Sequence, residues 1–121
     1  MASKVFGYRK LIAYQKGKEV VKRTYQLLKR FPADEKHAMC NQLRRASVSI
    51  TSNIAEGVNR FSVKDKSHFI EMSYGSLMEV SSQFEIAEEL GYISSEDRLS
   101  MDMLIEEEAR LLSGLQNSYK G

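Results

Sequence analysis

The sequence predicts an all-α fold, an antiparallel, up-down-up-down four-helix bundle built as a single domain over residues 1–121. Helix-favouring Leu, Glu, Lys, Arg and Met are plentiful, whereas the chain has one proline and no tryptophan. Apolar residues recur at spacings of three and four, as on one face of a helix. Short breaks divide the pattern, and short connections make neighbouring helices antiparallel. The predicted helices span about 9–30, 34–56, 63–90 and 95–118.

The first segment ends at Phe31-Pro32, because proline disfavours the helical conformation in the residue before it. Lys18 occupies a gap in its apolar pattern. The residues that this pattern predicts to face the core are Leu11, Tyr14, Val21, Tyr25 and Leu28.

The second segment starts near Asp34 and Glu35, where acidic side chains suit the positive end of the helix dipole. It ends near Gly57, which is available for a left-handed cap. Its predicted core residues are Met39, Leu43, Ala46, Ile50 and Ile54.

Serine caps open the last two segments. Ser62 has a capping-box partner in Asp65, and Ser94-Ser95 precedes two acidic residues. The third segment stops at Gly91. The predicted core residues are Phe69, Met72, Ser76, Val80, Phe84 and Ala87 in the third segment and Leu99, Met103, Leu104, Leu111, Leu112 and Leu115 in the fourth.

The composition excludes several classes of protein. Hydrophobic residues make up 42% and charged residues 28%, which is too apolar and too balanced for a disordered chain. The single cysteine, Cys40, excludes a disulfide scaffold. No uncharged run approaches the roughly 20 residues that span a bilayer, and residues 1–10 lack the apolar stretch of a signal peptide. We expect a cytoplasmic protein that does not bind membranes.

No catalytic or metal-binding motif stands out. His37 and His68 lie in different predicted helices, and His37 with Cys40 supplies only two of the three protein ligands that zinc usually needs. A surface histidine and a buried thiol are the simpler interpretation. The seven glycines are scattered, so none forms a phosphate-binding loop. We expect a protein that is not an enzyme and holds no cofactor or metal.

Charge is distributed unevenly along the chain. Residues 1–60 contain 13 Lys and Arg against 4 Asp and Glu, whereas residues 61–121 contain 5 against 12. This asymmetry favours either attraction between the two halves or binding to a polyanion.

Basic residues of the first helix form a candidate nucleic-acid surface. Four of them recur every seven residues and two more widen the row, a pitch of about 10 Å that suits a phosphate backbone. The row has no interleaved aromatic residue to stack on bases. A plain solvated face is one alternative, and pairing with the acidic residues Asp102, Glu106, Glu107 and Glu108 is another. The candidate binding residues are Arg9, Lys16, Lys22, Arg23, Lys29 and Arg30.

The second helix is unusual because small and polar side chains occupy most of its surface. Such a composition lets another helix approach closely, so we expect a neighbouring subunit to cover it; an ordinary amphipathic helix is the alternative. Gly75 and Ser76 are interpreted as packing residues in the interior of the third helix.

Two blocks, Gln42–Ile50 and Ser52–Gly57, carry a family resemblance. Together with Phe31-Pro32, Arg60-Phe61-Ser62 and Gly75–Glu79, they resemble the 23S rRNA intervening-sequence proteins, also called the four-helix-bundle protein family. The chain departs from the family pattern at two positions. Tyr14 stands where the family usually has tryptophan, and Thr51 where it usually has proline.

The resemblance implies a ring-like homopentamer. The chain also resembles a relative, the accessory variability protein of diversity-generating retroelements. That relative looks like a basic barrel that binds nucleic acid and a reverse transcriptase. The implied partners are therefore copies of the chain itself, RNA or DNA, and a reverse transcriptase or another protein. A scaffold that binds protein partners without nucleic acid is the alternative function. The residues expected at subunit interfaces or in structural roles are Arg44, Arg45, Ser49, Asn53, Glu56 and Gly75.

Overall fold

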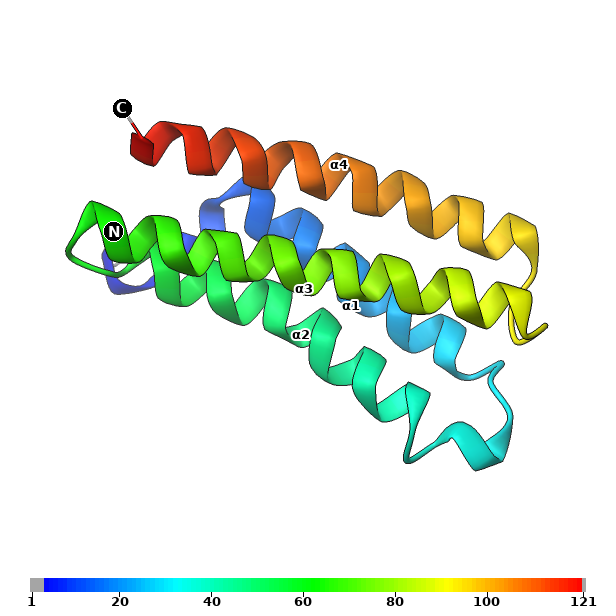
Figure 1. Ribbon diagram of the computed structural model, residues 1–121. Coiled ribbons are helices and arrows are strands. Elements are labelled where there is room, and N and C mark those ends of the chain that lie inside the picture. Colours follow the sequence, from blue (N-terminus) through cyan, green and yellow to red (C-terminus); the bar gives the residue numbers. More distant parts are fainter. Residues whose placement is uncertain (1–3, 121) are drawn as a thin grey trace.

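The computed structural model describes residues 4–120 and confirms the all-α fold (Figure 1). Successive helices run in opposite directions, and the last helix packs beside the first, which closes the bundle. No β-strand occurs in the described part of the chain. The α-helices are α1 (Ile12–Leu28), α2 (Met39–Val58), α3 (Val63–Glu89) and α4 (Ser95–Lys120), and the short 3-10 segments are η1 (Lys4–Lys10) and η2 (Ala33–Glu35).

Both predicted serine caps are present. Ser62 Oγ accepts the backbone N–H of Asp65 at 3.0 Å and starts α3. At the start of α4, Ser94 Oγ accepts the N–H of Asp97 at 3.0 Å, while Asp97 Oδ2 accepts the N–H of Ser94 at 3.4 Å. The second pair is a reciprocal capping box, which satisfies two N–H groups at the first turn.

The two predicted glycine stops behave differently. Gly91, at φ 81°, ends α3, and the N–H of Tyr92 closes back onto the last turn as in a Schellman motif. The left-handed cap predicted at Gly57 is wrong, because α2 continues through Gly57 to Val58. A Cβ atom at Gly57 would lie 2.8 Å from the Cβ of Phe69, so glycine is needed there for the close approach of α2 and α3.

The second helix starts later than predicted, at Met39 instead of about residue 34. Residues 33–35 form η2, and the backbone at Ala38 is not helical (φ −117°, ψ −103°). The carboxylate of Glu35 accepts a hydrogen bond from the hydroxyl of Tyr92 at 2.9 Å. Glu35 thus binds the loop before α4. The acidic segment 33–35 therefore stays outside α2, although its composition favours a helix start.

The first helix is shorter than the predicted 9–30 and is rotated relative to the prediction. It begins after Leu11, whose backbone is extended (φ −69°, ψ 133°). Of the five predicted core residues only Leu28 is buried, whereas Tyr25 is exposed and Leu11, Tyr14 and Val21 are partly exposed. The buried residues are Ala13, Gly17, Val20, Thr24, Leu27 and Leu28.

Small side chains explain this rotation. A Cβ atom at Gly17 would lie 2.8 Å from Glu108 Oε2 of α4 and 3.0 Å from Thr51 Cγ2 of α2. Gly17 therefore lets α1 approach two helices at once. The series that starts at Ala13 has the same alternating spacing as the predicted series, so spacing alone does not distinguish them.

The cores of the other helices match the prediction in part. In α2, Leu43, Ala46, Ile50 and Ile54 are buried as predicted. In α3, Val80, Phe84 and Ala87 are buried, but Met72 is exposed. In α4, Leu112 is buried, but Leu99 and Met103 are exposed. The core positions of α4 are instead taken by Met101 and Ile105 with the polar Asp97 and Glu108.

The close contact at Gly17 predicts that two glycine substitutions change the free energy of unfolding in opposite directions. Gly17→Ala should lower the free energy of unfolding by about 1–3 kcal/mol, because the added methyl group overpacks the site. Gly114→Ala, in the interior of α4 with no atom within 4 Å of the added Cβ, should raise it by about 0.5–1 kcal/mol. Chemical unfolding at one protein concentration measures both. Equal stabilities of the two variants would contradict the packing argument.

Candidate functional site

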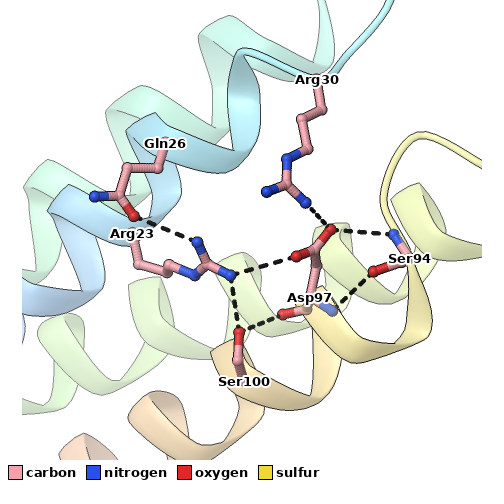
Figure 2. Close-up of polar contacts among 6 residues, drawn as sticks. All are labelled: Arg23, Gln26, Arg30, Ser94, Asp97 and Ser100. Carbon is pink, nitrogen blue, oxygen red and sulfur yellow. Dashed lines mark hydrogen bonds and ion pairs between the residues drawn. The ribbon is translucent and has the colours of Figure 1, made fainter.

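Two of the candidate nucleic-acid residues, one in α1 and one in the turn after it, bind the start of α4 (Figure 2). Arg23 Nη2 lies 3.4 Å from Asp97 Oδ1 and donates to Ser100 Oγ at 3.1 Å, and Arg23 Nη1 donates to Gln26 Oε1 at 3.3 Å. Arg30 Nη1 pairs with the other oxygen, Asp97 Oδ2. Both guanidinium groups are thus held within the chain.

The Asp97 carboxylate is the centre of this network. Burial opposes its charged form, but the hydrogen bonds from Arg30 and Ser94 outweigh burial and lower the pKa of Asp97 below its ordinary value. The side chain is therefore ionised at neutral pH. Its contribution to stability is present at neutral pH and is lost as the pH falls through the lowered pKa.

Lys16 also faces α4. Its Nζ lies 2.9 Å from Glu107 Oε2 and 3.1 Å from Glu19 Oε2, and these contacts raise the pKa of Lys16. Lys16 therefore pairs with the acidic helix, which was one of the alternatives for the basic row. Arg23 and Arg30 pair with Asp97 of the same helix.

The other acidic residues suggested as partners are engaged elsewhere. Asp102 pairs with Arg98 at 2.6 Å and Glu106 with Arg110 at 3.1 Å, both within α4. Glu108 is buried and makes no ion pair in the described part of the chain. The contact between α1 and α4 thus uses Asp97, which the sequence suggested only as a helix start.

The remaining candidate cations are exposed. In η1, the guanidinium of Arg9 lies 4.1 Å from the centre of the Phe6 ring. Lys22 and Lys29 project from α1 with no ion pair to any described residue. The rotation of α1 also brings Lys18 and Tyr25 to this side, at about 100° per residue. We call Lys18, Lys22, Tyr25 and Lys29 the outer α1 face.

Acidic residues are few near the outer α1 face. The only acidic residue of α1, Glu19, precedes Lys22 by one turn but pairs with Lys16, and the sequence from Lys36 to Ala55 contains none. In α2, Arg44 is half-buried and lies two turns before Thr51, which is next to Gly17 of α1. Most acidic residues belong to α3 and α4. The bundle therefore has a basic side, formed by α1 and α2, and an acidic side.

Two of the residues expected at a subunit interface or in a structural role make hydrogen bonds within the chain, and one of them, Ser49, links α2 to α3. Ser49 Oγ and Ser76 Oγ share a hydrogen bond of 2.9 Å. The buried Asn53 donates from Nδ2 to the backbone oxygen and to Oγ of Ser49, both at 2.9 Å. Ser73 Oγ donates to the backbone oxygen of Ile50 at 2.8 Å. Ser49 and Asn53 are structural in the single chain.

The other interface candidates lie on or near the surface. Arg45 is exposed and lines a groove between α2 and α3, whereas Arg44 is half-buried. Glu56 is exposed and lies 3.5 Å from Arg60. The packing role predicted for Gly75 is wrong within the chain, because a Cβ atom there would meet nothing within 4 Å. Ser76 does pack, through its hydrogen bond to α2.

Phe61, in the turn between α2 and α3, was not singled out as a surface residue by the sequence. Its side chain is fully exposed, and it borders a shallow hollow lined by the small residues Ser52 and Ala55 of α2. Val48, on the outer side of α2, is also exposed. An exposed aromatic residue beside small side chains is a feature of protein interfaces.

Comparison with known proteins identifies the family. The sequence model described as 23S rRNA-intervening sequence protein matches residues 9–114. The chain belongs to this family. It is also similar to the crystal structure of a protein of unknown function from the S23 ribosomal protein family of Bacteroides thetaiotaomicron VPI-5482, at 23% identity and a TM-score of 0.78. The alignment covers 87% of this chain and 98% of that one, and it supports the fold. No curated protein matches the chain.

This family member contains one unusual buried carboxyl group. Glu108 is 0% exposed, and neither of its oxygens has a hydrogen-bond partner. Burial raises the pKa of Glu108 to about 8, although Lys16 nearby lowers it and Glu19 raises it. The group is therefore protonated at neutral pH. The sequence placed Glu108 among surface acids, and only its position four residues before the buried Leu112 hinted otherwise.

Metal ligands do not gather in this structure. His37 and His68 are exposed, and Cys40 is buried in the core, which raises the pKa of its thiol. Within residues 4–120, no three His, Cys, Asp or Glu side chains come close enough to hold a metal ion. None of the described helices combines the length and apolar character needed to cross a membrane.

Burial of Glu108 predicts a pH dependence of stability. Because the folded chain holds the proton up to about pH 8 and an unfolded carboxyl releases it near 4.5, the free energy of unfolding falls as the pH rises between these values. Glu108→Gln should remove this fall and raise the free energy of unfolding at pH 7, by on the order of 3 kcal/mol.

Urea unfolding at pH 5, 7 and 9 measures this effect. The matched control is Glu107→Gln, the adjacent residue, whose side chain is 49% exposed. It should leave the pH profile nearly unchanged. A Glu108→Gln profile parallel to that of the parent would contradict the assignment.

Proposed function

We propose that this family member is a non-enzymatic, homo-oligomeric protein that binds nucleic acid through the outer α1 face. The observation that carries the proposal is that Lys18, Lys22 and the C-cap residue Lys29 share one side of α1, and none of them pairs with a described acidic side chain. Cations in this arrangement bind phosphates and release condensed counterions.

The proposed site differs from the row of six cations in the sequence. Lys22 and Lys29 remain in it, and Lys18 joins them. Lys16, Arg23 and Arg30 have a structural role in holding α4, although Arg30 keeps about half of its side chain exposed and adds to the local field. Arg9 extends the positive charge toward the end of the bundle.

Arg44 adds positive charge from α2. Gly17 of α1 lies against Thr51 of α2. Counting seven residues away from this contact along both antiparallel helices brings Arg44 level with Thr24, next to Tyr25. In an oligomer, several copies of the basic side would create a field much stronger than the formal charge of +2 suggests.

Self-assembly is proposed through the outer surface of α2 and α3. The supporting features are the exposed Phe61 and Val48, the small residues beside them, and Gly75 in mid-helix without a close neighbour. A glycine inside a helix costs about 1 kcal/mol relative to alanine. Close approach of a second copy would explain why position 75 is a glycine, which packing within the single chain does not explain. The family resemblance favours a pentamer.

A scaffold that binds protein partners, such as a reverse transcriptase, is the second candidate. It is favoured by one observation, the pairing of Lys16, Arg23 and Arg30 with acidic residues of α4. If the two halves of the chain neutralise each other sufficiently, no salt-sensitive binding to nucleic acid is expected. Binding measurements at two salt concentrations distinguish the candidates.

Neutralising the outer α1 face should weaken binding to nucleic acid. The triple variant Lys18→Gln, Lys22→Gln, Lys29→Gln should lose at least about tenfold in affinity for duplex DNA at low salt. The slope of log K against log salt should become less steep by about 2–3, because three phosphate contacts are lost. Fluorescence anisotropy titrations at several salt concentrations measure both quantities.

The control for this experiment changes two cations outside the outer α1 face, one on α3 and one on α4. Lys64→Gln with Arg110→Gln should bind like the parent, and both variants should keep the parent's thermal midpoint. Unchanged affinity and salt slope in the triple variant would remove the outer α1 face from the proposal.

A large side chain at position 75 should disrupt assembly without disrupting the fold. Gly75→Leu adds a side chain where a Cβ atom meets nothing within 4 Å of the single chain, so the helix content should be unchanged while the oligomer dissociates or weakens. Gly114→Leu on α4, where an added Cβ atom also meets nothing within 4 Å, should keep the parent's mass. Light scattering after size exclusion measures the masses. A parent that is monomeric at micromolar concentration would refute self-assembly.

A further inference from the structure

We infer that the outer α1 face binds single-stranded nucleic acid, with Tyr25 stacking on an unpaired base while Lys18, Lys22 and Lys29 contact phosphates. The inference rests on the proposed function and names the form of nucleic acid that the site takes. RNA and DNA share this chemistry, since both have phosphates and bases with exposed faces when single-stranded.

The four side chains lie along one line of the helix. At about 100° per residue they fall within an arc of about 60°. At a rise of about 1.5 Å per residue, Lys18 and Lys22 are about 6 Å apart along the axis, and Lys22 and Lys29 about 10 Å apart. Tyr25 lies between the last two. An aromatic ring is therefore flanked by cations on both sides, as in surfaces that track a single strand.

The ring of Tyr25 has no partner in the described part of the chain. The side chain is 42% exposed, its hydroxyl makes no hydrogen bond, and it stacks on no other ring or cation. The other tyrosine of α1, Tyr14, differs because its ring contacts Tyr8 and the ammonium of Lys18. Tyr25, which the sequence placed in the core, thus presents an unused aromatic surface on the basic side of the bundle. The expectation of a basic row without an interleaved aromatic residue is therefore wrong for the outer α1 face.

Stacking on Tyr25 requires a base that is not already stacked on its neighbours. In a duplex the base faces are covered, so only the lysines contribute to binding there. In a single strand an unstacked base can lie on the ring while its phosphates reach the lysines. The outer α1 face should therefore bind single strands more tightly than duplexes.

The test compares Tyr25→Ala with the parent on labelled oligonucleotides of about 12 nucleotides. The probes are a single-stranded RNA, a single-stranded DNA, the DNA duplex, and a single-stranded DNA with abasic sites. Tyr25→Ala should weaken binding to the single strands with bases by about 5- to 150-fold, the range found for loss of one stacked base. Duplex and abasic probes should bind both proteins within about twofold. Comparison of the RNA and DNA single strands shows whether the sugar changes the binding affinity.

Two further variants separate stacking from folding and from charge. Tyr25→Phe should restore binding to single strands, because the ring remains. Tyr74→Ala removes a tyrosine of similar exposure (37%) that borders Glu71 between α3 and α4, and it should bind like the parent. The salt slope for single strands, about −2 for three lysines, should be the same in the parent and in Tyr25→Ala.

The results separate the inference from the proposed function. Equal binding of the parent and Tyr25→Ala to single strands, with salt-dependent binding retained, would overturn the stacking inference and leave the proposed function standing. Equal weakening of all four probes in Tyr25→Ala would also overturn it. Absence of binding to every probe at low salt would refute the proposed function as well.

Discussion

The close approach of α1 to two helices at Gly17 determines how the rest of the molecule is arranged. With no side chain at this position, α1 fits against Thr51 of α2 and Glu108 of α4. That fit sets the rotation of α1. The rotation turns Arg23 and Arg30 toward α4 and leaves Lys22 with Tyr25 on the outside. Packing in the core thereby decides which charges serve the fold and which are available to a partner.

Two buried carboxyl groups of α4 show opposite solutions to the cost of burial. Asp97 is ionised and is stabilised by Arg23, Arg30 and the capping hydrogen bonds. Glu108 has no such partners and keeps its proton at neutral pH. Burying an unpaired charge costs far more free energy than burying a neutral polar group, so a carboxyl group without partners is buried with its proton. The contact between α1 and α4 is accordingly polar and ordered at one end and tightly packed in the middle.

The sequence predicted both ends of α3 and the start of α4 because their caps are local. Ser62, Ser94 and Gly91 act through atoms a few residues away, so their roles can be read from their neighbours. It predicted the face of α1 wrongly because two alternating series fit the same spacing, and the chosen one favoured large residues over Ala13 and Gly17. Since every assignment of inward and outward charge in α1 depends on that choice, the error passed directly into the candidate site.

The segregation of charge between the two sides of the bundle has a consequence that the formal charge hides. Because α1 and α2 are mainly basic and α3 and α4 mainly acidic, the molecule has an electric dipole directed across its short axis. Such a body rotates in the field of a charged surface before it touches it. Both cation- and anion-exchange resins can therefore retain it near neutral pH, and it meets a polyanion with the α1–α2 side leading.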